Sequence, residues 1–336
     1  MRSRLRMLAL PIGAGFLSAC IALAPTRSTD PGPAADVAVR QVSFVQHVAE
    51  PAALPTAIPE TAIPRTAVIL SAEIPAYAEI AAEILRRDAA HATVHTLSAE
   101  PDRAARLIAE LATAKPDRIV AVGLLAAIAA REVPNVPTVF CQVYNYHDHD
   151  LVSATSKGVH LLPPFELQLR EWRQLGQSPG RIGAVTGPGH DALLAEMRRA
   201  AESFGVELTV RTVRSDREAL HAFSELAPDI DGFWLLPDNR ILSPDVVRRI
   251  LSYSAEHGKQ VATFGESLLN MGALLSLTGD PRDVVDRVLA RFEAVDEDGR
   301  LLGPDLLPLT AVRTRINDDV AERMGLIALV STAAAR

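Results

Sequence analysis

The side chains best suited to hold a small molecule stand where apolar runs give way to loops. Asp238 follows the run Phe233–Leu236, and its carboxylate could form a charge-assisted hydrogen bond to the ammonium group of a ligand. Because aspartate followed by asparagine also favours turns, a turn or helix-cap role is the alternative. We expect Asp238 to face a ligand.

Three hydroxyl side chains, Ser71, Thr186 and Ser267, lie at the ends of other predicted strands. Beside helix N-termini, where backbone N–H groups point outward, such hydroxyls can bind a ligand carboxylate. Capping of the helices themselves is the alternative. Gly123 ends a further strand and belongs to the predicted ligand site.

The segment after the strand predicted at residues 137–143 carries ring and amide side chains. Gln142 lies at the end of this strand and Tyr144 follows it, and a tyrosine ring could stack on an aromatic ligand. The run His147–Asp150 alternates histidine and aspartate, as some metal sites do. A solvated loop between lobes is the more usual interpretation, so we predict no metal and no cofactor.

From Thr66 onward, short apolar runs alternate with segments of helical periodicity. This alternation predicts an α/β fold, in which helices cover parallel strands. The predicted strands cover residues 66–71, 93–97, 118–122, 137–143, 181–185, 207–213, 232–236 and 260–264, with short strands near 306–309 and 314–316. The predicted helices cover residues 76–87, 101–114, 124–132, 164–175, 190–204, 217–226, 244–257 and 281–292.

A polar stretch near residue 160 divides this pattern into two similar halves. We therefore expect two doubly wound parallel-sheet lobes joined by a hinge. Lobe one covers residues 65–160 and is completed by about 265–330, and lobe two covers 161–264. Ligands of open parallel sheets bind beyond the carboxyl ends of the strands, so two lobes that face one another by these edges would enclose a ligand.

The first twenty residues predict export. Three arginines among the first six residues precede the apolar stretch Met7–Phe16. This stretch is shorter than the ~20 residues of a membrane-spanning helix, as in a signal peptide. Leu17–Cys20 looks like a bacterial lipobox, whose thiol takes a lipid that anchors the protein to a membrane. An ordinary secretory signal with a chance cysteine is the alternative. Residues 21–64, rich in Pro, Ala, Thr and Ser, predict a tether.

The composition argues against several function classes. The 336 residues carry a formal net charge of −7, without a cluster of Lys and Arg on one segment, so nucleic acid is not an expected partner. No nucleophile-elbow, P-loop or HExxH spacing occurs, and we predict a protein that is not an enzyme. Lipid attachment would consume Cys20, which leaves Cys141 without a disulfide partner.

Several motifs make the chain resemble a known family. Trp234–Asn239, Gln260–Gly265 and Gly272–Leu274, with Pro137–Phe140 in the first half, are similar to segments of ABC-transporter substrate-binding lipoproteins. Better-known members bind tryptophan or other aromatic amino acids. The resemblance spans about residues 66–326. It implies the type I periplasmic-binding-protein fold, a small-molecule ligand between the lobes, and an ABC permease in the inner membrane as partner.

Two stretches depart from the family: residues 142–150, where members usually carry an acidic Asp-Pro step, and residues 154–160. Both lie at the expected ligand edge, so the ligand need not be that of the best-studied members. We expect a lipid-anchored solute-binding component of an ABC importer, exported to the periplasmic side of the cell envelope. The rival interpretation is a structural or regulatory envelope lipoprotein that keeps the bilobal fold without the transport role.

Overall fold

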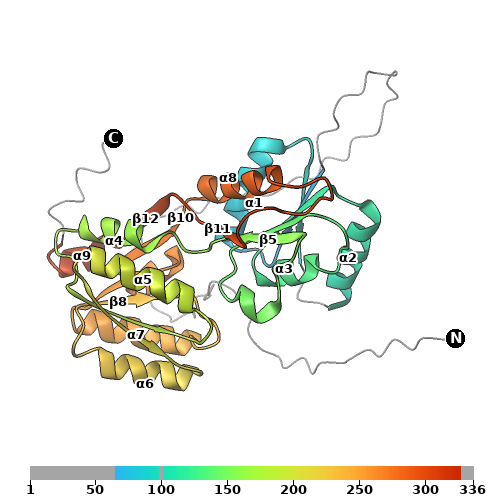
Figure 1. Ribbon diagram of the computed structural model, residues 1–336. Helices are drawn as coiled ribbons and strands as arrows, with labels where there is room; N and C mark the ends of the chain where they lie inside the picture. The colour runs from blue at the N-terminus through green and yellow to red at the C-terminus, as the bar shows by residue number, and fades with distance from the viewer. Residues whose placement is uncertain (1–64, 98–100, 327–336) are drawn as a thin grey trace, which may run out of the picture.

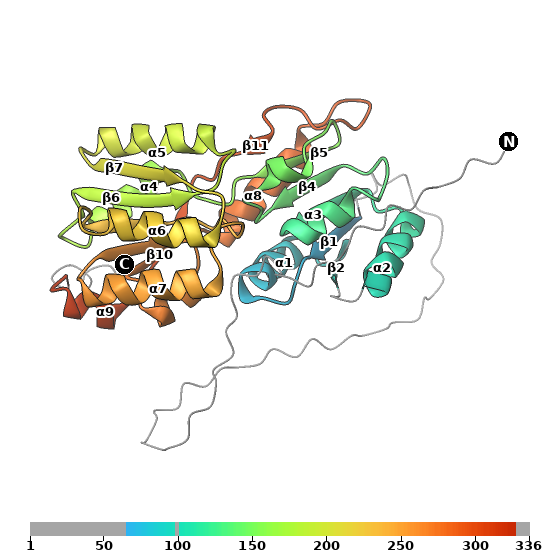
Figure 2. The same ribbon diagram turned by 90° about the horizontal axis from the view of Figure 1, so that it is seen from below.

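The computed structural model describes residues 65–97 and 101–326, which form two α/β lobes side by side (Figure 1, Figure 2). The predicted signal peptide, Cys20 and the tether lie outside the described residues. Each lobe is built on a six-stranded sheet. Within the described ranges, no helix combines the length and the apolar character needed to cross a bilayer.

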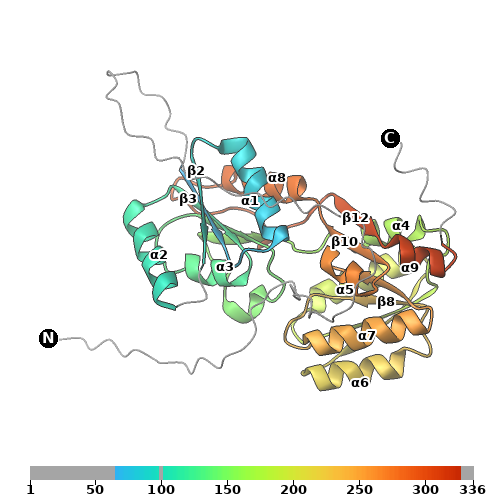
Figure 3. The same cartoon turned by 180° about the vertical axis from the view of Figure 1, so that it is seen from behind.

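Lobe one has a parallel sheet in the order β11-β5-β4-β3-β1-β2. Alternate residues of β1 enter two cores: Val68 and Leu70 pack with α1 and α8, whereas Ala67 and Ile69 pack with α2 and α3 on the other face (Figure 3). Because both faces are covered, the residues of β1 after Thr66 are all apolar. The elements are β1 (Thr66–Leu70), α1 (Pro75–Asp88), β2 (Ala92–Thr96), α2 (Pro101–Ala114), β3 (Arg118–Val122), α3 (Leu124–Ala130), β4 (Thr138–Cys141), the 3-10 helix η1 (Tyr146–His149), β5 (Ser156–Val159), α8 (Pro281–Glu293) and β11 (Leu306–Leu307).

Lobe two has the sheet order β12-β10-β9-β8-β6-β7, parallel except that β12 runs antiparallel to β10. Helices α4 and α5 cover one face, and α6 and α7 cover the other (Figure 1). Trp234 of β8 lies in the core beneath α4, where its Nε1–H donates to Gln168 Oε1 at 3.0 Å. The elements are α4 (Phe165–Arg173), β6 (Arg181–Thr186), α5 (Asp191–Ser203), β7 (Glu207–Thr212), α6 (Asp216–Leu226), β8 (Gly232–Leu235), α7 (Pro244–Glu256), β9 (Gln260–Thr263), the 3-10 helix η2 (Glu266–Met271), β10 (Leu275–Gly279), β12 (Val312–Ile316) and α9 (Asp318–Arg323).

The chain returns to lobe one later than the sequence predicts. The expected return at about residue 265 is wrong, because β10 pairs with β9 and remains in the lobe-two sheet. Among the described residues after β10, α8, β11 and the segments next to them complete lobe one, and β12 then crosses back to pair with β10. The predicted boundary at residues 265–330 therefore assigns β10, β12 and α9 to the wrong lobe.

Three crossovers connect the lobes: β5 to α4, β10 to α8, and β11 to β12. They pass close to one another. A Cβ on Gly279 would lie 2.6 Å from the side chain of Leu309 on the third crossover and 3.9 Å from the carbonyl oxygen of Leu161 on the first. Glycine at this position therefore lets the connecting strands pack together at the hinge.

Asp283, in the first turn of α8, fixes the third crossover. Its Oδ2 accepts hydrogen bonds from the backbone N–H groups of Thr310 (2.6 Å) and Ala311 (3.0 Å), and its Oδ1 accepts from Thr310 Oγ1 (2.7 Å). Burial disfavours the charged carboxyl, but these hydrogen bonds outweigh it and lower the pKa of Asp283 below its ordinary value of 3.8. The carboxylate thus satisfies backbone donors that a hinge segment would otherwise leave unpaired.

Asp283→Asn should reduce the free energy of unfolding by about 1.5–3 kcal/mol at pH 7, since hydrogen bonds to a charged group are lost. Because the folded-state pKa is depressed, this contribution is present above pH ~4 and is lost as the pH falls through the lower folded-state pKa. Urea denaturation of both proteins at several pH values measures it.

Asp286→Asn is the matched control on the same helix. Asp286 is about half exposed and pairs with Arg87, and an exposed ion pair contributes at most ~1 kcal/mol. Equal losses in the two variants at pH 7 would contradict a specific role of Asp283 at the hinge.

Candidate functional site

The carboxyl ends of the strands carry most of the predicted ligand residues. Ser71, Gly123 and Gln142 follow β1, β3 and β4 in lobe one, and Thr186 and Asp238 lie at the ends of β6 and β8 in lobe two. The structure brings these residues into two groups, one within lobe one and one that bridges the lobes. Ser267 lies apart from both, exposed on η2.

Ser71 and Gly123 form the group within lobe one. Ser71 Oγ accepts a hydrogen bond from the backbone N–H of Ala126 at 2.8 Å, which is the capping role considered as the alternative. Gly123, before α3, has φ +88, and a Cβ there would lie 2.6 Å from Ser71 Oγ and 2.7 Å from the Tyr77 hydroxyl. Close packing of these side chains therefore requires glycine at position 123. A ligand role for Ser71 and Gly123 stays a prediction.

The segment that follows β4 reaches from lobe one to lobe two. Gln142 has φ +60, which is uncommon for a residue other than glycine, and it turns the chain toward lobe two. The hydroxyl of Tyr144 lies 3.3 Å from Thr186 Oγ1, and its ring centroid lies 4.3 Å from that of His190. Burial raises the pKa of Tyr144 far above its usual value, so this phenol remains protonated.

Asp238 is fully buried, and lobe two itself satisfies its carboxylate. Its Oδ2 accepts from the backbone N–H of Gly187 (2.7 Å) and from Arg240 Nη2 (2.7 Å). Its Oδ1 accepts from the Nε (2.9 Å) and the backbone N–H (3.2 Å) of Arg240. Burial opposes ionisation, but the bonds from Arg240 and Gly187 outweigh it and lower the pKa of Asp238. Asp238 is therefore ionised and already paired with a cation.

Arg240 is one of the residues that the sequence analysis missed, together with Asn145 and His190. Its guanidinium makes a two-point ion pair with Asp238, and Nη2 also donates to the carbonyl oxygen of Pro188 at 3.0 Å. Nη1 points the other way and donates to Asp148 Oδ2 of η1, in lobe one, at 2.9 Å. The side chains of Arg240 and Asp148 are 26% and 41% exposed. An arginine two residues after a strand-end aspartate was the signal available in the sequence.

Asn145 and His190 complete the bridge between the lobes. Asn145 Nδ2 donates to the side-chain oxygen of Asn239 (2.9 Å) and to Asp238 Oδ1 (3.3 Å). His190 Nε2 lies 3.0 Å from Asn145 Oδ1 and 2.9 Å from Arg240 Nη2. Because Nε2 can either donate to the oxygen or accept from the guanidinium, it satisfies only one of these contacts at a time. Burial is the main cause of the lowered pKa of His190, which favours the neutral ring.

The run His147–Asp150 does not gather into a metal site among the residues that the structure describes. His147 lies against the ring of Tyr146, with centroids 3.7 Å apart, and Asp148 pairs with Arg240. The carbonyl oxygen of His149 accepts a hydrogen bond from Arg131. The segment thus acts as a contact between the lobes.

A second interlobe contact is made by Arg313. Arg313 of β12 donates to Glu79 of α1 at 2.6 Å and to Glu266 of η2 at 3.3 Å. Burial opposes the charge of Arg313, but the two carboxylates outweigh it and raise the pKa of the guanidinium. The lobes are therefore joined by a second ion pair, Arg313–Glu79, besides Arg240–Asp148.

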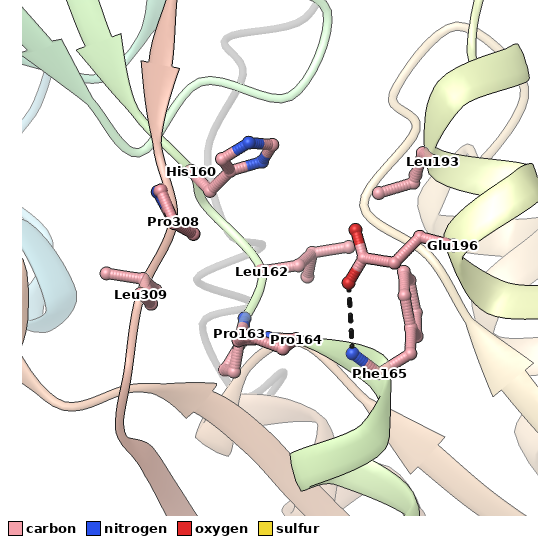
Figure 4. Close-up of a pocket in the computed structure, with 9 residues that line it drawn as sticks. All are labelled: His160, Leu162, Pro163, Pro164, Phe165, Leu193, Glu196, Pro308 and Leu309. Carbon is pink, nitrogen blue, oxygen red and sulfur yellow. Dashed lines mark hydrogen bonds between the residues drawn. The ribbon is translucent and has the colours of Figure 1, made fainter. Parts of the chain in front are cut away.

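A small hollow lies at the hinge itself (Figure 4). Its volume of about 30 Å³ suits water rather than a solute. Within it, Glu196 of α5 accepts a hydrogen bond from the backbone N–H of Phe165 at 3.3 Å, at the start of α4. Burial raises the pKa of Glu196 and lowers the pKa of His160. The lining residues are His160, Leu162, Pro163, Pro164, Phe165, Leu193, Glu196, Pro308 and Leu309.

Comparison with known proteins shows the fold. No protein-family model matches the chain, and no curated protein matches its sequence. A substrate-binding protein with adhesive properties from Clostridium difficile, in a ligand-free, open form, has a TM-score of 0.57 at 13% identity, covering 78% of this chain and 95% of that chain. An ABC domain in complex with L-Trp from Streptococcus pneumonia has a TM-score of 0.55 at 16% identity, covering 78% and 94%. A conserved domain protein from Vibrio cholerae has a TM-score of 0.54 at 20% identity, with the same coverage.

These similarities confirm the predicted fold class. The chain has two doubly wound α/β lobes joined by a hinge, the type I periplasmic-binding-protein fold. At these identities the likeness concerns the fold, and the ligand must be argued from the residues of this chain.

Gly123→Ala should destabilise the protein more than Gly189→Ala. Both glycines have φ near +90, where an L side chain adds about 1–3 kcal/mol of backbone strain. A Cβ at position 189 meets no atom within 4 Å, whereas one at position 123 overlaps Ser71 and Tyr77. We expect a further loss of about 1–3 kcal/mol from overpacking in Gly123→Ala. Equal midpoints of urea denaturation for the two variants would show that the packing around Gly123 yields easily.

Proposed function

We propose that the protein is the solute-binding component of an ABC importer. It captures a small molecule between its two lobes and delivers it to a permease in the membrane. The observation that carries the proposal is the convergence of polar side chains from both lobes on the strand ends, where Tyr144 and Asn145 of lobe one meet Thr186 and His190 of lobe two. In open α/β sheets this edge is where ligands bind.

The connection between the lobes supports the same proposal. Within the described residues, the chain crosses between the lobes three times. Rotation about such connections opens and closes the two lobes around a ligand. The structural neighbours include a substrate-binding protein and a domain that holds L-Trp. Binding rather than catalysis is the activity that we propose.

Export and lipid anchoring belong to the proposal. Leu17–Cys20 after a short apolar stretch supports a lipid on Cys20, and residues 21–64 then connect the membrane to the lobes. With two or more acyl chains, such an anchor holds a protein on a membrane stably. The lobes would then work on the periplasmic side, close to their permease.

A structural or regulatory envelope lipoprotein is the second candidate. It is favoured by the direct contacts between the lobes, in which Asp148 of lobe one pairs with Arg240 of lobe two without any solute. A scaffold would keep these contacts permanently, whereas a receptor would exchange them for a ligand.

Ligand binding should raise the melting temperature of the purified protein, because a solute that binds only the folded state stabilises it by mass action. The measurement is a thermal-shift screen of amino acids, small organic acids, amines and nucleosides, with native mass spectrometry for a copurified compound. The absence of any thermal shift and of any copurified compound would favour the structural or regulatory lipoprotein.

Cys20→Ser should release the protein from the membrane fraction and abolish its labelling with radioactive palmitate, because the thiol is the site of lipid attachment. Cys141→Ser is the matched control, because Cys141 is a buried thiol in the lobe-one core. This variant should stay in the membrane fraction like the wild type. Membrane retention and labelling of the Cys20 variant at the wild-type level would overturn the anchor.

A further inference from the structure

We propose that the ligand carries an anionic group, such as a carboxylate, and that this group binds the Arg240 guanidinium in the place that Asp148 takes in this structure. Asp148 is then an internal competitor, a lobe-one carboxylate that stands in for the ligand. The inference rests on the proposed function of a solute receptor and names the chemical class of its solute.

Lobe two alone holds the guanidinium of Arg240 in place. Nε and Nη2 are fixed by the two oxygens of Asp238 at 2.9 and 2.7 Å, and Nη2 is also fixed by the Pro188 carbonyl at 3.0 Å. These partners belong to lobe two and remain when the lobes separate. Nη1 is directed toward lobe one, so a preorganised donor awaits an acceptor at that edge.

An ammonium group would find the carboxylate of Asp238 already occupied. Within lobe two, its two oxygens accept from the backbone of Gly187 and from three nitrogens of Arg240, and Oδ1 also accepts from Asn145 Nδ2 of lobe one. A cationic ligand would have to displace the guanidinium from a fully buried carboxylate. The first expectation for Asp238, an ammonium partner, therefore gives way to its role as the residue that positions Arg240.

Asp148 is suited to being displaced. Its side chain is 41% exposed, and it lies on η1, a 3-10 helix of four residues. Exposed ion pairs are weak because water and salt screen them. The carboxylate nevertheless lies 2.9 Å from Nη1, which shows that an anion fits this position sterically and electrostatically. Asp238 neutralises the charge of Arg240 overall. The selectivity for an anionic ligand group therefore comes from the direct hydrogen bond to Nη1 rather than from long-range attraction.

The neighbouring contacts also change when the lobes separate. Asn145 of lobe one lies 3.0 Å from Nε2 of His190, and Asp148 of lobe one accepts from Nη1 of Arg240. When the lobes part, both residues leave with lobe one, so Nε2 of His190 and Nη1 of Arg240 become open to a ligand.

The test uses sets of compounds that share a shape and differ in charge: succinate and succinamide, glutarate and glutaramide, and phenylacetate, phenylacetamide and phenethylamine. Thermal shift followed by isothermal titration should find at least one carboxylate that binds the wild-type protein while its amide and amine do not. Asp148→Asn should bind that carboxylate about twofold to fivefold more tightly, because a weak competing ion pair is gone.

Arg240→Gln should bind the same carboxylate at least about tenfold more weakly, because a charge-assisted hydrogen bond to the ligand is lost. Asp245→Asn and Arg248→Gln are matched controls from an exposed ion pair on α7 and should bind like the wild type. The Asp148 variant keeps the proposal testable if Arg240→Gln does not fold.

Two results overturn the inference alone. One is binding of amides or amines in preference to carboxylates, and the other is weaker carboxylate binding by Asp148→Asn, which would make Asp148 a ligand contact. Both leave the receptor function standing. If no compound binds the wild-type protein or Asp148→Asn, and no solute copurifies, both the proposed function and this inference are contradicted.

Discussion

The two-point ion pair between Asp238 and Arg240 determines the shape of the lobe-two edge. A buried carboxylate needs a cation and several hydrogen-bond donors, and here Arg240 supplies both together with the backbone of Gly187. A Cβ at position 187 would lie 2.6 Å from Arg240 Nη2 and 2.7 Å from Asp238 Oδ2. The turn after β6, at Gly187, and the turn after β8, which carries Asp238 and Arg240, therefore pack closely against one another. Two lobe-one side chains, Asn145 and Asp148, make hydrogen bonds directly to this ion pair.

Much of the fold could be predicted from the sequence, because strands covered on both faces are recognisable as short apolar runs. The strand at 118–122 and the helix at 101–114 match the structure residue for residue. β5 was missed because Ser156–Val159 begins with two polar residues beside a glycine and lies next to the two-residue edge strand β11. β10 was missed because Leu275–Gly279 follows a 3-10 helix rather than an α-helix, so the alternating pattern was broken.

The site was predictable only in part. Strand ends are found from the pattern, so Thr186, Tyr144 and Asp238 were placed at one edge, where the structure has them. The partner of a side chain depends on turn geometry, which periodicity does not describe. The turn after β8 brings Arg240 back onto the aspartate two residues before it, and this converts Asp238 from a free carboxylate into half of an ion pair. A charged residue at a strand end therefore indicates a functional edge. It does not reveal whether that edge offers a positive or a negative group to a ligand.

The crossing of the chain between the lobes also makes both lobes depend on the C-terminal part of the sequence. The core of lobe one includes Val284, Val285 and Val288 of α8, and the lobe-two sheet gains its edge strand only with Val312–Ile316. Both lobes therefore depend on contacts between residues far apart in sequence, which form slowly. A truncated chain that ends before α8 would leave the first sheet partly uncovered on the face that packs against α1.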